Sequence, residues 1–294
     1  MKLRKRHIIL LLPLGLIAAM QMEFLAFRKS DRKQAQYLLE RGQEAPTFHT
    51  YEIDGRTIHY THVGDEGKPL LVLIHGAPGS SSAFMDYLAD TVLTQFVQLI
   101  AVDRPGYGWS DYGRAERSVQ AQAAQLQPLL VRHEASQTLL LGHSYGGPVI
   151  ARMAMDYPEQ VNGLIIVAGS VDPELEPHEW WRKPADTPPV RWILPGSMKV
   201  CNQEILPLRD ELTEMLPLWE KVRCPVTIVQ GVKDKLVPAG NADFAEQALV
   251  NSARVEKHLL EDGNHFILWT RRSEIREMIR NLVNFNDRAR EAAE

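Results

Sequence analysis

The chain has 294 residues, of which 45% are hydrophobic and 24% are charged, and its net charge at pH 7 is −4. These values are ordinary for a globular protein and suit one large α/β domain with an insertion, or two modest domains. Basic residues cluster only near the N-terminus, so the Lys/Arg stripe of a nucleic-acid-binding protein is missing and nucleic acid is excluded as a partner.

Residues 1–27 differ from the rest of the chain and predict an N-terminal signal peptide or membrane anchor. A basic stretch at 2–6 precedes an uncharged apolar run at 8–20, which is short for a spanning helix and suits a signal peptide. If Gln21 and Glu23 lie near the membrane surface, residues 8–27 form an uncleaved anchor instead. Basic residues flank both ends, so charge does not decide the topology.

We expect an exported protein of bacterial type, attached to the inner membrane through 8–27. The alternatives are a cleaved leader with release into the periplasm, and an amphipathic helix folded onto the domain.

Residues 28–43 are charged with few apolar positions and predict a solvated helical connector. After it, alternating segments at 48–53 and 57–63 surround Asp54-Gly55, which predicts a β-hairpin. Continuous apolar runs at 69–75 and 97–102 predict strands buried on both faces, with a helix at 83–89 between them.

The same alternation continues with a helix at 118–133, a strand at 138–141, a helix at 148–157 and a strand at 164–168. Strands that alternate with helices predict a parallel sheet with helices on both faces. We therefore assign residues 44–170 to the first part of an α/β core.

Residues 171–222 break the pattern with many prolines and with Trp180, Trp181 and Trp192. An insertion between two strands at this place predicts a small helical lid over the carboxyl edge of the sheet; a partly ordered surface excursion is the alternative. The core resumes over 223–294, with a strand at 225–230, a helix at 239–249 and a strand at 254–260. A closing helix is predicted at 266–285, followed by a charged tail expected to fray.

The segment 142–146, Gly-His-Ser-Tyr-Gly, lies between a strand and a helix, where the G-x-S-x-G motif places an exposed nucleophile on a tight turn. Ser144 is therefore the candidate nucleophile. Side chains at Gly142 and Gly146 would collide in such a turn. The amide of Tyr145, at a helix N-terminus, is a candidate oxyanion donor.

A serine hydroxyl needs a base, and His265 follows the last predicted strand at the sheet's active edge. His143 is adjacent to the serine, so the tight turn is expected to point it away. Asp234, after the preceding strand, is the candidate partner of His265, with Asp172 and Asp262 as reserves.

The loop after the strand at 69–75 is expected to supply the second oxyanion donor, the amide of Ala77, because Pro78 has no amide hydrogen. His75 is predicted to support this loop through hydrogen bonds rather than to bind a metal. Asp103 and Arg104 predict an ion pair that braces a glycine-rich turn. Cys201 and Cys224 form no metal motif and are expected to be buried thiols, with a disulfide as the alternative in an exported protein.

Four motifs occur in order: His-Gly-Ala-Pro-Gly at 75–79, Asp-Arg-Pro-Gly-Tyr-Gly-Trp-Ser at 103–110, Gly-His-Ser-Tyr-Gly-Gly at 142–147 and Gly-Asn-His at 263–265. With them the chain resembles the α/β-hydrolase fold family. The resemblance implies an eight-stranded, mostly parallel sheet, a cap inserted after the sixth strand, and no cofactor or metal. Haloalkane dehalogenases and epoxide hydrolases have an aspartate where Ser144 stands. Proline iminopeptidases usually have a tryptophan where Tyr145 stands, and the lipase-type His-Gly-Gly-Gly is absent.

The sequence thus predicts a serine hydrolase with Ser144, Asp234 and His265 as catalytic residues and the amides of Ala77 and Tyr145 as oxyanion donors. A carboxylic ester is the expected substrate, and the lid tryptophans favour a small molecule with an apolar portion. A C–C bond hydrolase or amidase with the same triad is the first alternative. A non-catalytic ligand-binding relative is the second.

Overall fold

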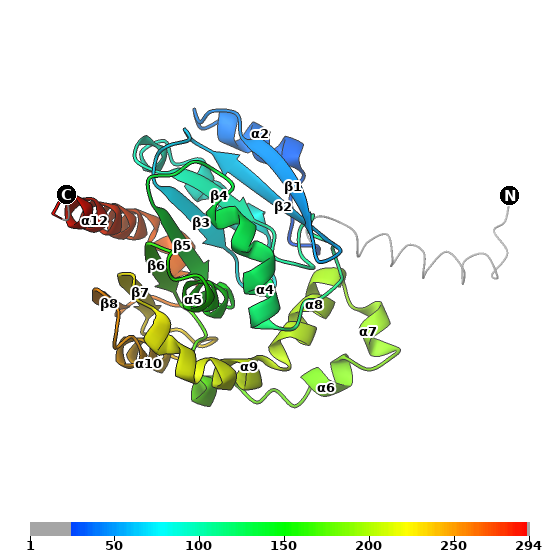
Figure 1. Ribbon diagram of the computed structural model, residues 1–294. Helices are drawn as coiled ribbons and strands as arrows, with labels where there is room; N and C mark the ends of the chain where they lie inside the picture. Colours follow the sequence, from blue (N-terminus) through cyan, green and yellow to red (C-terminus); the bar gives the residue numbers. More distant parts are fainter. Residues whose placement is uncertain (1–24, 293–294) are drawn as a thin grey trace, which may run out of the picture.

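The computed structural model describes residues 25–292, and within them eight strands form one sheet flanked by helices (Figure 1). The predicted leader at 1–27 lies almost entirely outside the described residues. The strands are β1 (Thr47–Ile53), β2 (Arg56–Val63), β3 (Leu70–Ile74), β4 (Gln98–Val102), β5 (Thr138–His143), β6 (Gly163–Val167), β7 (Val226–Gly231) and β8 (Val255–Leu260).

The sheet order is β1-β2-β4-β3-β5-β6-β7-β8. β1 pairs antiparallel with β2, and β2 pairs antiparallel with β4, while all pairings from β4 to β8 are parallel. The predicted α/β fold with a mostly parallel sheet of eight strands is confirmed. The chain winds from β3 toward one edge and then from β5 toward the other, so the carboxyl ends of β3 and β5 form the switch point where such sheets bind ligands.

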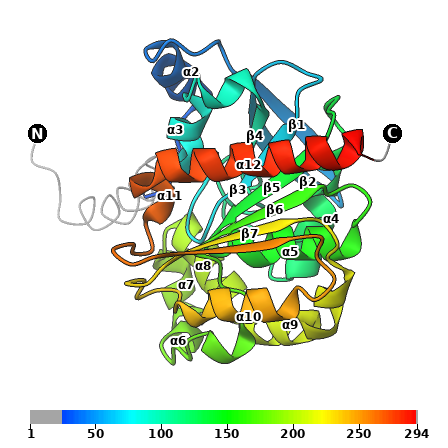
Figure 2. The ribbon, with the colours of Figure 1, turned by 90° about the vertical axis from the view of Figure 1, so that its left-hand side faces the viewer.

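Helices cover both faces of the sheet, as predicted. They are α2 (Asp31–Leu39), α3 (Met85–Leu88), α4 (Val119–Leu126), α5 (Gly146–Asp156), α6 (Arg182–Ala185), α7 (Val190–Ile193), α8 (Gly196–Ile205), α9 (Leu208–Met215), α10 (Gly240–Ala248), α11 (Ile267–Thr270) and α12 (Arg272–Glu291). Figure 2 shows α12 crossing one face of the sheet while α5 and α10 lie on the other.

Each face of the sheet has its own apolar core because alternate side chains of a strand point to opposite sides. In β3, Leu70, Val72 and Ile74 join the core under α4 and α5, whereas Leu71 and Leu73 join the core under α3 and α12. All five side chains of β3 are fully buried, which explains the continuous apolar run in the sequence.

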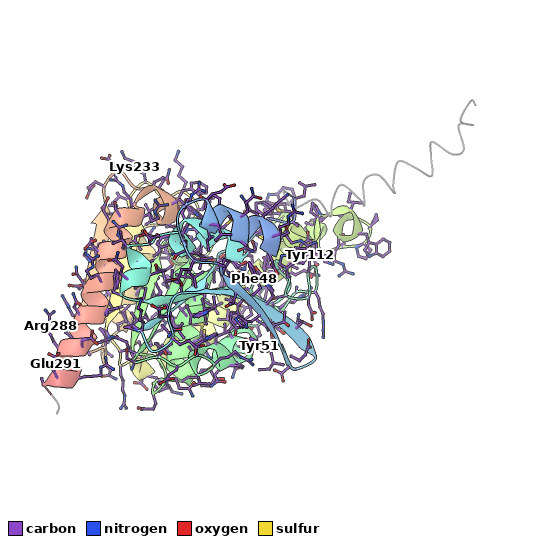
Figure 3. All side chains as sticks on the ribbon, turned by 90° about the horizontal axis from the view of Figure 1, so that it is seen from above. Phe48, Tyr51, Tyr112, Lys233, Arg288 and Glu291 are labelled. Carbon is purple, nitrogen blue, oxygen red and sulfur yellow. The ribbon has the colours of Figure 1, made fainter. Side chains whose placement is uncertain are left out.

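Three predicted elements differ from the structure. The connector helix α2 is not fully solvated, because Gln34 and Leu38 are buried against the core. The helix predicted at 118–133 ends earlier as an α-helix and continues as a 3₁₀ turn, Gln127–Leu130, where Pro128 lacks the amide that α-helical bonding needs. The predicted frayed tail is helical, since α12 continues to Glu291; Figure 3 shows Arg288 and Glu291 at its far end.

Candidate active site

Ser144 lies on a tight turn between β5 and α5, with a backbone φ of 54°. This left-handed conformation is strained for a residue with a side chain, and such strain is concentrated at functional sites. The Ser144 amide donates to the carbonyl of Val167 on β6 at 3.0 Å, which fixes the turn against the sheet. A side chain at Gly142 would lie 2.3 Å from the carbonyl oxygen of Gly146. The collision that the sequence predicts for a side chain in this turn is therefore present in the structure.

His265 and Asp234 meet at the same edge of the sheet, on the loops that follow β8 and β7. The Nδ1 of His265 donates to Oδ2 of Asp234 at 2.8 Å, and the two side chains are largely buried. This bond leaves Nε2 as the ring nitrogen free to exchange a proton with another group. The structure therefore places Asp234, rather than Asp172 or Asp262, against the histidine. Asp172 instead accepts from the amide of Glu174, and Asp262 pairs with Lys233.

The hydrogen bonds around Asp234 keep its carboxylate ionised. Burial alone would raise the pKa of Asp234, but the bond from His265 and those from the amides of Val237 and Leu236 more than offset it, and the pKa is lowered. The two amides donate to Oδ1 at 2.9 and 2.8 Å. A negative charge so held orients the imidazole and stabilises its protonated form.

His143 lines the same cavity as Ser144 and supports the candidate base. Its Nε2 donates to the carbonyl of His265 at 3.0 Å, and the two ring centroids are 4.8 Å apart. Burial and the neighbouring His265 lower the pKa of His143 to about 4, so its ring is neutral near pH 7. This supporting role had no signal in the sequence beyond its place next to Ser144.

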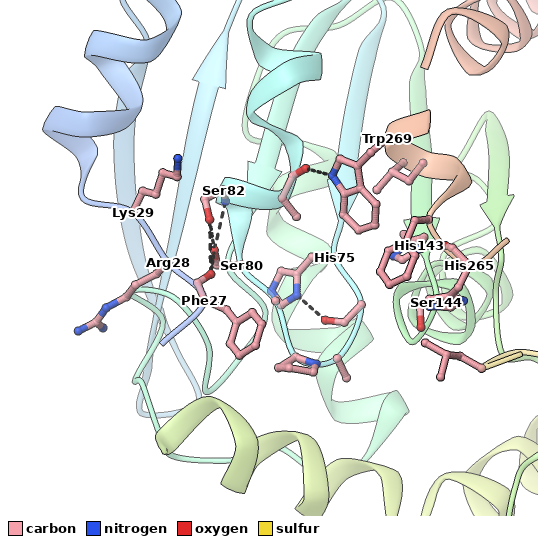
Figure 4. A pocket seen from close by; sticks show the side chains of 18 of the residues that line it. Phe27, Arg28, Lys29, His75, Ser80, Ser82, His143, Ser144, His265 and Trp269 are labelled. Atoms are coloured by element: carbon pink, nitrogen blue, oxygen red, sulfur yellow. Dashed lines mark hydrogen bonds between the residues drawn. The ribbon is translucent and has the colours of Figure 1, made fainter. Parts of the chain in front are cut away.

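Ser144 and His265 line one cavity of about 820 Å³, drawn from close by in Figure 4. The walls are mostly apolar and come from distant parts of the chain, including Phe27 at the end of the predicted leader, Met198 from α8 and Trp269 from α11. A cavity of this size with a few convergent polar groups is typical of a small-molecule site. The contribution of Phe27 was not predicted.

The loop after β3 lies directly beside the nucleophile. A side chain at Gly76 would meet the Cβ of Ser144 at 2.8 Å, and Ala77 lines the cavity. His75 supports this loop through hydrogen bonds, as predicted: Nδ1 donates to the carbonyl of Gly76 at 2.7 Å, and Nε2 accepts from the amide of Arg104 at 3.0 Å. Burial and the charge of Arg104 lower the pKa of His75 to about 3, which keeps the ring neutral.

The predicted ion pair between Asp103 and Arg104 is wrong, because each side chain has a different partner. Asp103 accepts from Nδ1 of His59 at 2.9 Å and from the amide of Trp109, so it still braces the glycine-rich turn. Arg104 pairs with Glu204 of α8. Adjacent residues on an extended segment project in different directions, which separates the two charges.

The segment between β6 and β7 contains α6 to α9, where the lid is predicted, and its function as a lid stays a prediction. Met198 of this segment lines the cavity. Its tryptophans do not: Trp180 and Trp192 are exposed by 75% and 71%. Their expected role in an apolar substrate site therefore finds no support in the position of their side chains.

Cys201 and Cys224 are both free thiols, and Cys201 is buried. Burial raises the pKa of each to about 12, which makes them poor nucleophiles. Among residues 25–292, no group of three or more His, Cys, Asp or Glu side chains is arranged to hold a metal ion.

The chain belongs to the alpha/beta hydrolase family, whose model matches residues 71–277. This places the four motifs and the Ser144 turn within a family of hydrolases.

Among individual proteins, the chain is similar to the serine hydrolase BPHL of Mus musculus, with 26% identity over 72% of this chain and 78% of that one. A stretch of 115 residues is 30% identical to epoxide hydrolase 4 of Mus musculus and covers 38% of this chain and 32% of that protein.

Solved structures extend the likeness in fold. A membrane phospholipase A described as a bacterial virulence factor has a TM-score of 0.64 and 21% identity, over 97% of this chain and 99% of that one. An esterase from Exiguobacterium antarcticum has a TM-score of 0.64 and 22% identity, over 81% of this chain and 99% of that one. The chain is an α/β-hydrolase enzyme by family and by fold.

Proposed function

We propose that this chain is a serine hydrolase that cleaves carboxylic esters through an acyl-enzyme. The proposal is carried by the hydrogen bond from His265 to Asp234, formed at the wall of a cavity that also contains Ser144 on its strained turn. Nucleophile, base and orienting carboxylate follow in the chain order that this architecture uses.

In the proposed reaction, Oγ of Ser144 attacks the ester carbonyl while Nε2 of His265 accepts the hydroxyl proton. The carbonyl electron pair moves to oxygen, and the amides of Ala77 and Tyr145 donate to that oxyanion. The intermediate collapses, the C–O bond to the alcohol breaks, and His265 returns its proton to the leaving alkoxide. Water, deprotonated by His265, then attacks the acyl-serine and releases the acid and the free hydroxyl of Ser144.

Serine at position 144 supports acyl transfer over epoxide opening. The family's epoxide hydrolases form their covalent intermediate with an aspartate at this position, and a serine ether would not be hydrolysed by the same base. The apolar walls of the cavity favour a substrate with an apolar acyl or alcohol portion.

The proposal also includes an exported, membrane-attached location, which rests on the basic and apolar pattern of residues 1–27. Within residues 25–292, no helix is long and apolar enough to cross a bilayer. Attachment therefore depends on the part of the predicted anchor that precedes the described residues, because residues 25–27 pack against the domain. Extraction of membranes with alkaline carbonate separates the alternatives: an anchored chain stays in the pellet, and a cleaved one is released.

Labelling with a fluorophosphonate probe tests the central claim. The wild-type chain is expected to be labelled and Ser144→Ala is not, and p-nitrophenyl esters of increasing acyl length are expected to be turned over only by the wild type. Labelling that survives the alanine substitution would remove Ser144 from the mechanism. Labelling without ester turnover would favour an amidase, a C–C bond hydrolase or a non-catalytic ligand-binding protein.

A further inference from the structure

The junction between the predicted anchor, which ends at Phe27, and the connector that begins at Arg28 forms part of the cavity wall. Phe27, Arg28 and Lys29 all line the cavity that contains Ser144 and His265. Figure 4 shows these three residues on the side of the cavity away from Ser144. A segment whose place in the sequence suggests only a tether thus faces the candidate reaction centre.

Hydrogen bonds fix this segment in place. The carbonyl of Phe27 accepts from the hydroxyl of Ser80 at 2.6 Å, and the carbonyl of Leu25 accepts from the hydroxyl of Ser197 at 2.6 Å. Ala26, between them, is fully buried. Phe27 itself has a φ of 52°, a strained conformation that persists only where the surroundings impose it. The chain therefore leaves the described domain between the loop after β3 and the start of α8.

The mouth of the cavity is apolar and open to solvent. Leu236, Phe266 and Met198 line the cavity and are exposed by 59%, 52% and 40%. Close by along the chain, Trp192 and Ile193 of α7 are exposed by 71% and 59%, and Ser197, which bonds Leu25, follows on α8. The three exposed apolar residues at the opening mark an interaction surface. Trp192 does not line the cavity, but tryptophan favours the membrane–water interface.

The charged residues at the cavity are also of one sign. Its described lining includes Arg28 and Lys29 and no carboxylate. The guanidinium of Arg28 lies over the ring of Trp109, at 4.0 Å from its centroid. It also donates to the carbonyl of Gly108 at 2.7 Å, and the ammonium of Lys29 lies 5.7 Å from the ring centroid of Tyr37. Both charges therefore lie outside the cavity, where the chain leaves the domain (Figure 4).

We propose that this face of the protein rests on an anionic bilayer and that the site cleaves a long-chain acyl ester of a membrane lipid. The proposal deepens the esterase function and rests on it. Leu25 to Phe27 pack against the domain, so if the part of the predicted anchor before them lies in the membrane, they lie at its surface together with the cavity mouth. The acyl chain then enters along Phe27 and the exposed apolar rim, while Lys29 and Arg28 face the anionic head groups of the bilayer surface.

The test uses the full-length chain reconstituted into vesicles of phosphatidylethanolamine and phosphatidylglycerol with palmitoyl and oleoyl chains. Fatty acid released from the vesicles is measured beside hydrolysis of soluble p-nitrophenyl butyrate. Phe27→Ala removes an apolar wall and is expected to lower the ratio of lipid to butyrate hydrolysis by about tenfold or more. Lys29→Gln is expected to slow lipid hydrolysis more in vesicles rich in phosphatidylglycerol than in vesicles rich in phosphatidylethanolamine.

Matched controls use residues far from the cavity. Phe48→Ala on the outer hairpin, labelled in Figure 3, and Lys221→Gln on an exposed turn are expected to leave the ratio of lipid to butyrate hydrolysis unchanged. A second readout is quenching of tryptophan fluorescence by vesicles with brominated acyl chains, which Trp192→Ala is expected to reduce.

The two proposals fail differently. Absence of Ser144-dependent hydrolysis of any ester would overturn the esterase function. Hydrolysis of butyrate with no release of fatty acid from vesicles would overturn the lipid substrate alone, as would an equal effect of Phe27→Ala on both substrates. If quenching is unchanged in Trp192→Ala, this face does not lie on the bilayer.

Discussion

Glu204 and Arg104 form a bidentate ion pair in which both side chains are fully buried, with N–O distances of 2.8 and 2.9 Å. Glu204 belongs to α8 of the predicted lid, and Arg104 follows β4 of the core. Arg104 also donates to the carbonyl of His75 at 2.8 Å and to that of Gly76 at 3.1 Å. The lid segment is thereby tied to the loop that carries Ala77. Burial alone would lower the pKa of Arg104, and the charge of Glu204 more than reverses this.

Glu204→Gln keeps the side-chain size and leaves the buried guanidinium without its counter-charge. Such a loss typically costs about 3–5 kcal/mol of unfolding free energy, so we expect a clear fall in the unfolding temperature. Because the Ala77 loop loses its brace, kcat for p-nitrophenyl butyrate is expected to fall more than KM rises. The exposed Glu220→Gln is the control. An unfolding temperature equal to that of the wild type would show that the pair does not support the loop.

The strain at Ser144 gives a second prediction that separates stability from activity. Both Ser144→Ala and Ser144→Gly remove the nucleophile and are expected to abolish ester hydrolysis. Only glycine adopts a φ of 54° without steric cost, so Ser144→Gly is expected to be more stable than Ser144→Ala by about 1 kcal/mol. Thermal or urea unfolding of the two inactive variants measures the difference. Equal stabilities would mean that the turn is not strained.

The features that the sequence predicts well arise from local rules. The glycines at 142 and 146 are required by sterics within a few residues, and the continuous apolar run of β3 follows from burial on both faces. The sequence predicts His265 and Asp234 because parallel strands bring the loops that follow the strands to one edge of the sheet. The structure brings these two side chains into contact.

The features that the sequence missed depend on contacts between distant residues. Glu204 lies 100 positions from Arg104, on a helix whose pattern gives no sign of a buried charge. The cavity wall formed by Phe27 depends on hydrogen bonds from Ser80 and Ser82. The last turns of α12 are held by Asp287, which accepts from Gln137 at 3.0 Å, so a tail that looks free to fray is tied to the loop before β5.

Asp234→Asn tests the orienting role of the carboxylate. The amide cannot stabilise a protonated His265, and it favours the wrong ring tautomer, so kcat is expected to fall by about 10³ to 10⁴ with little change in KM. Asp262→Asn is the matched control, because Asp262 is an exposed residue paired with Lys233 and is expected to keep near-normal activity. Equal activities of Asp234→Asn and wild type would show that another group orients His265.

A cluster of three histidines packs on the opening hairpin, away from the cavity. The rings of His62 and His133 stack at 4.3 Å between centroids, and His49 lies 5.7 Å from His133. Nδ1 of His133 bonds Glu66 at 3.0 Å, and Nε2 of His62 bonds Gln98. Burial and the neighbouring histidines lower the pKa values of His49 and His62. Arg132 lowers the pKa of His49 further, and Glu66 opposes the shift of both histidines.

These shifts predict a loss of stability in mild acid. A histidine with a lowered pKa in the folded state binds a proton more readily when unfolded, so its stabilising effect is complete above the ordinary value of 6.5 and decreases as the pH falls below it. We expect the unfolding temperature to drop between about pH 7.5 and pH 5.5. The variant His49→Phe keeps the stacking on Tyr60 and is expected to reduce that drop by roughly 2 °C. Scanning calorimetry at both pH values measures it. An equal drop in His49→Phe and wild type would assign the acid sensitivity to other groups. His59 is not one of them, because the hydrogen bond that it donates to Asp103 raises its pKa despite burial.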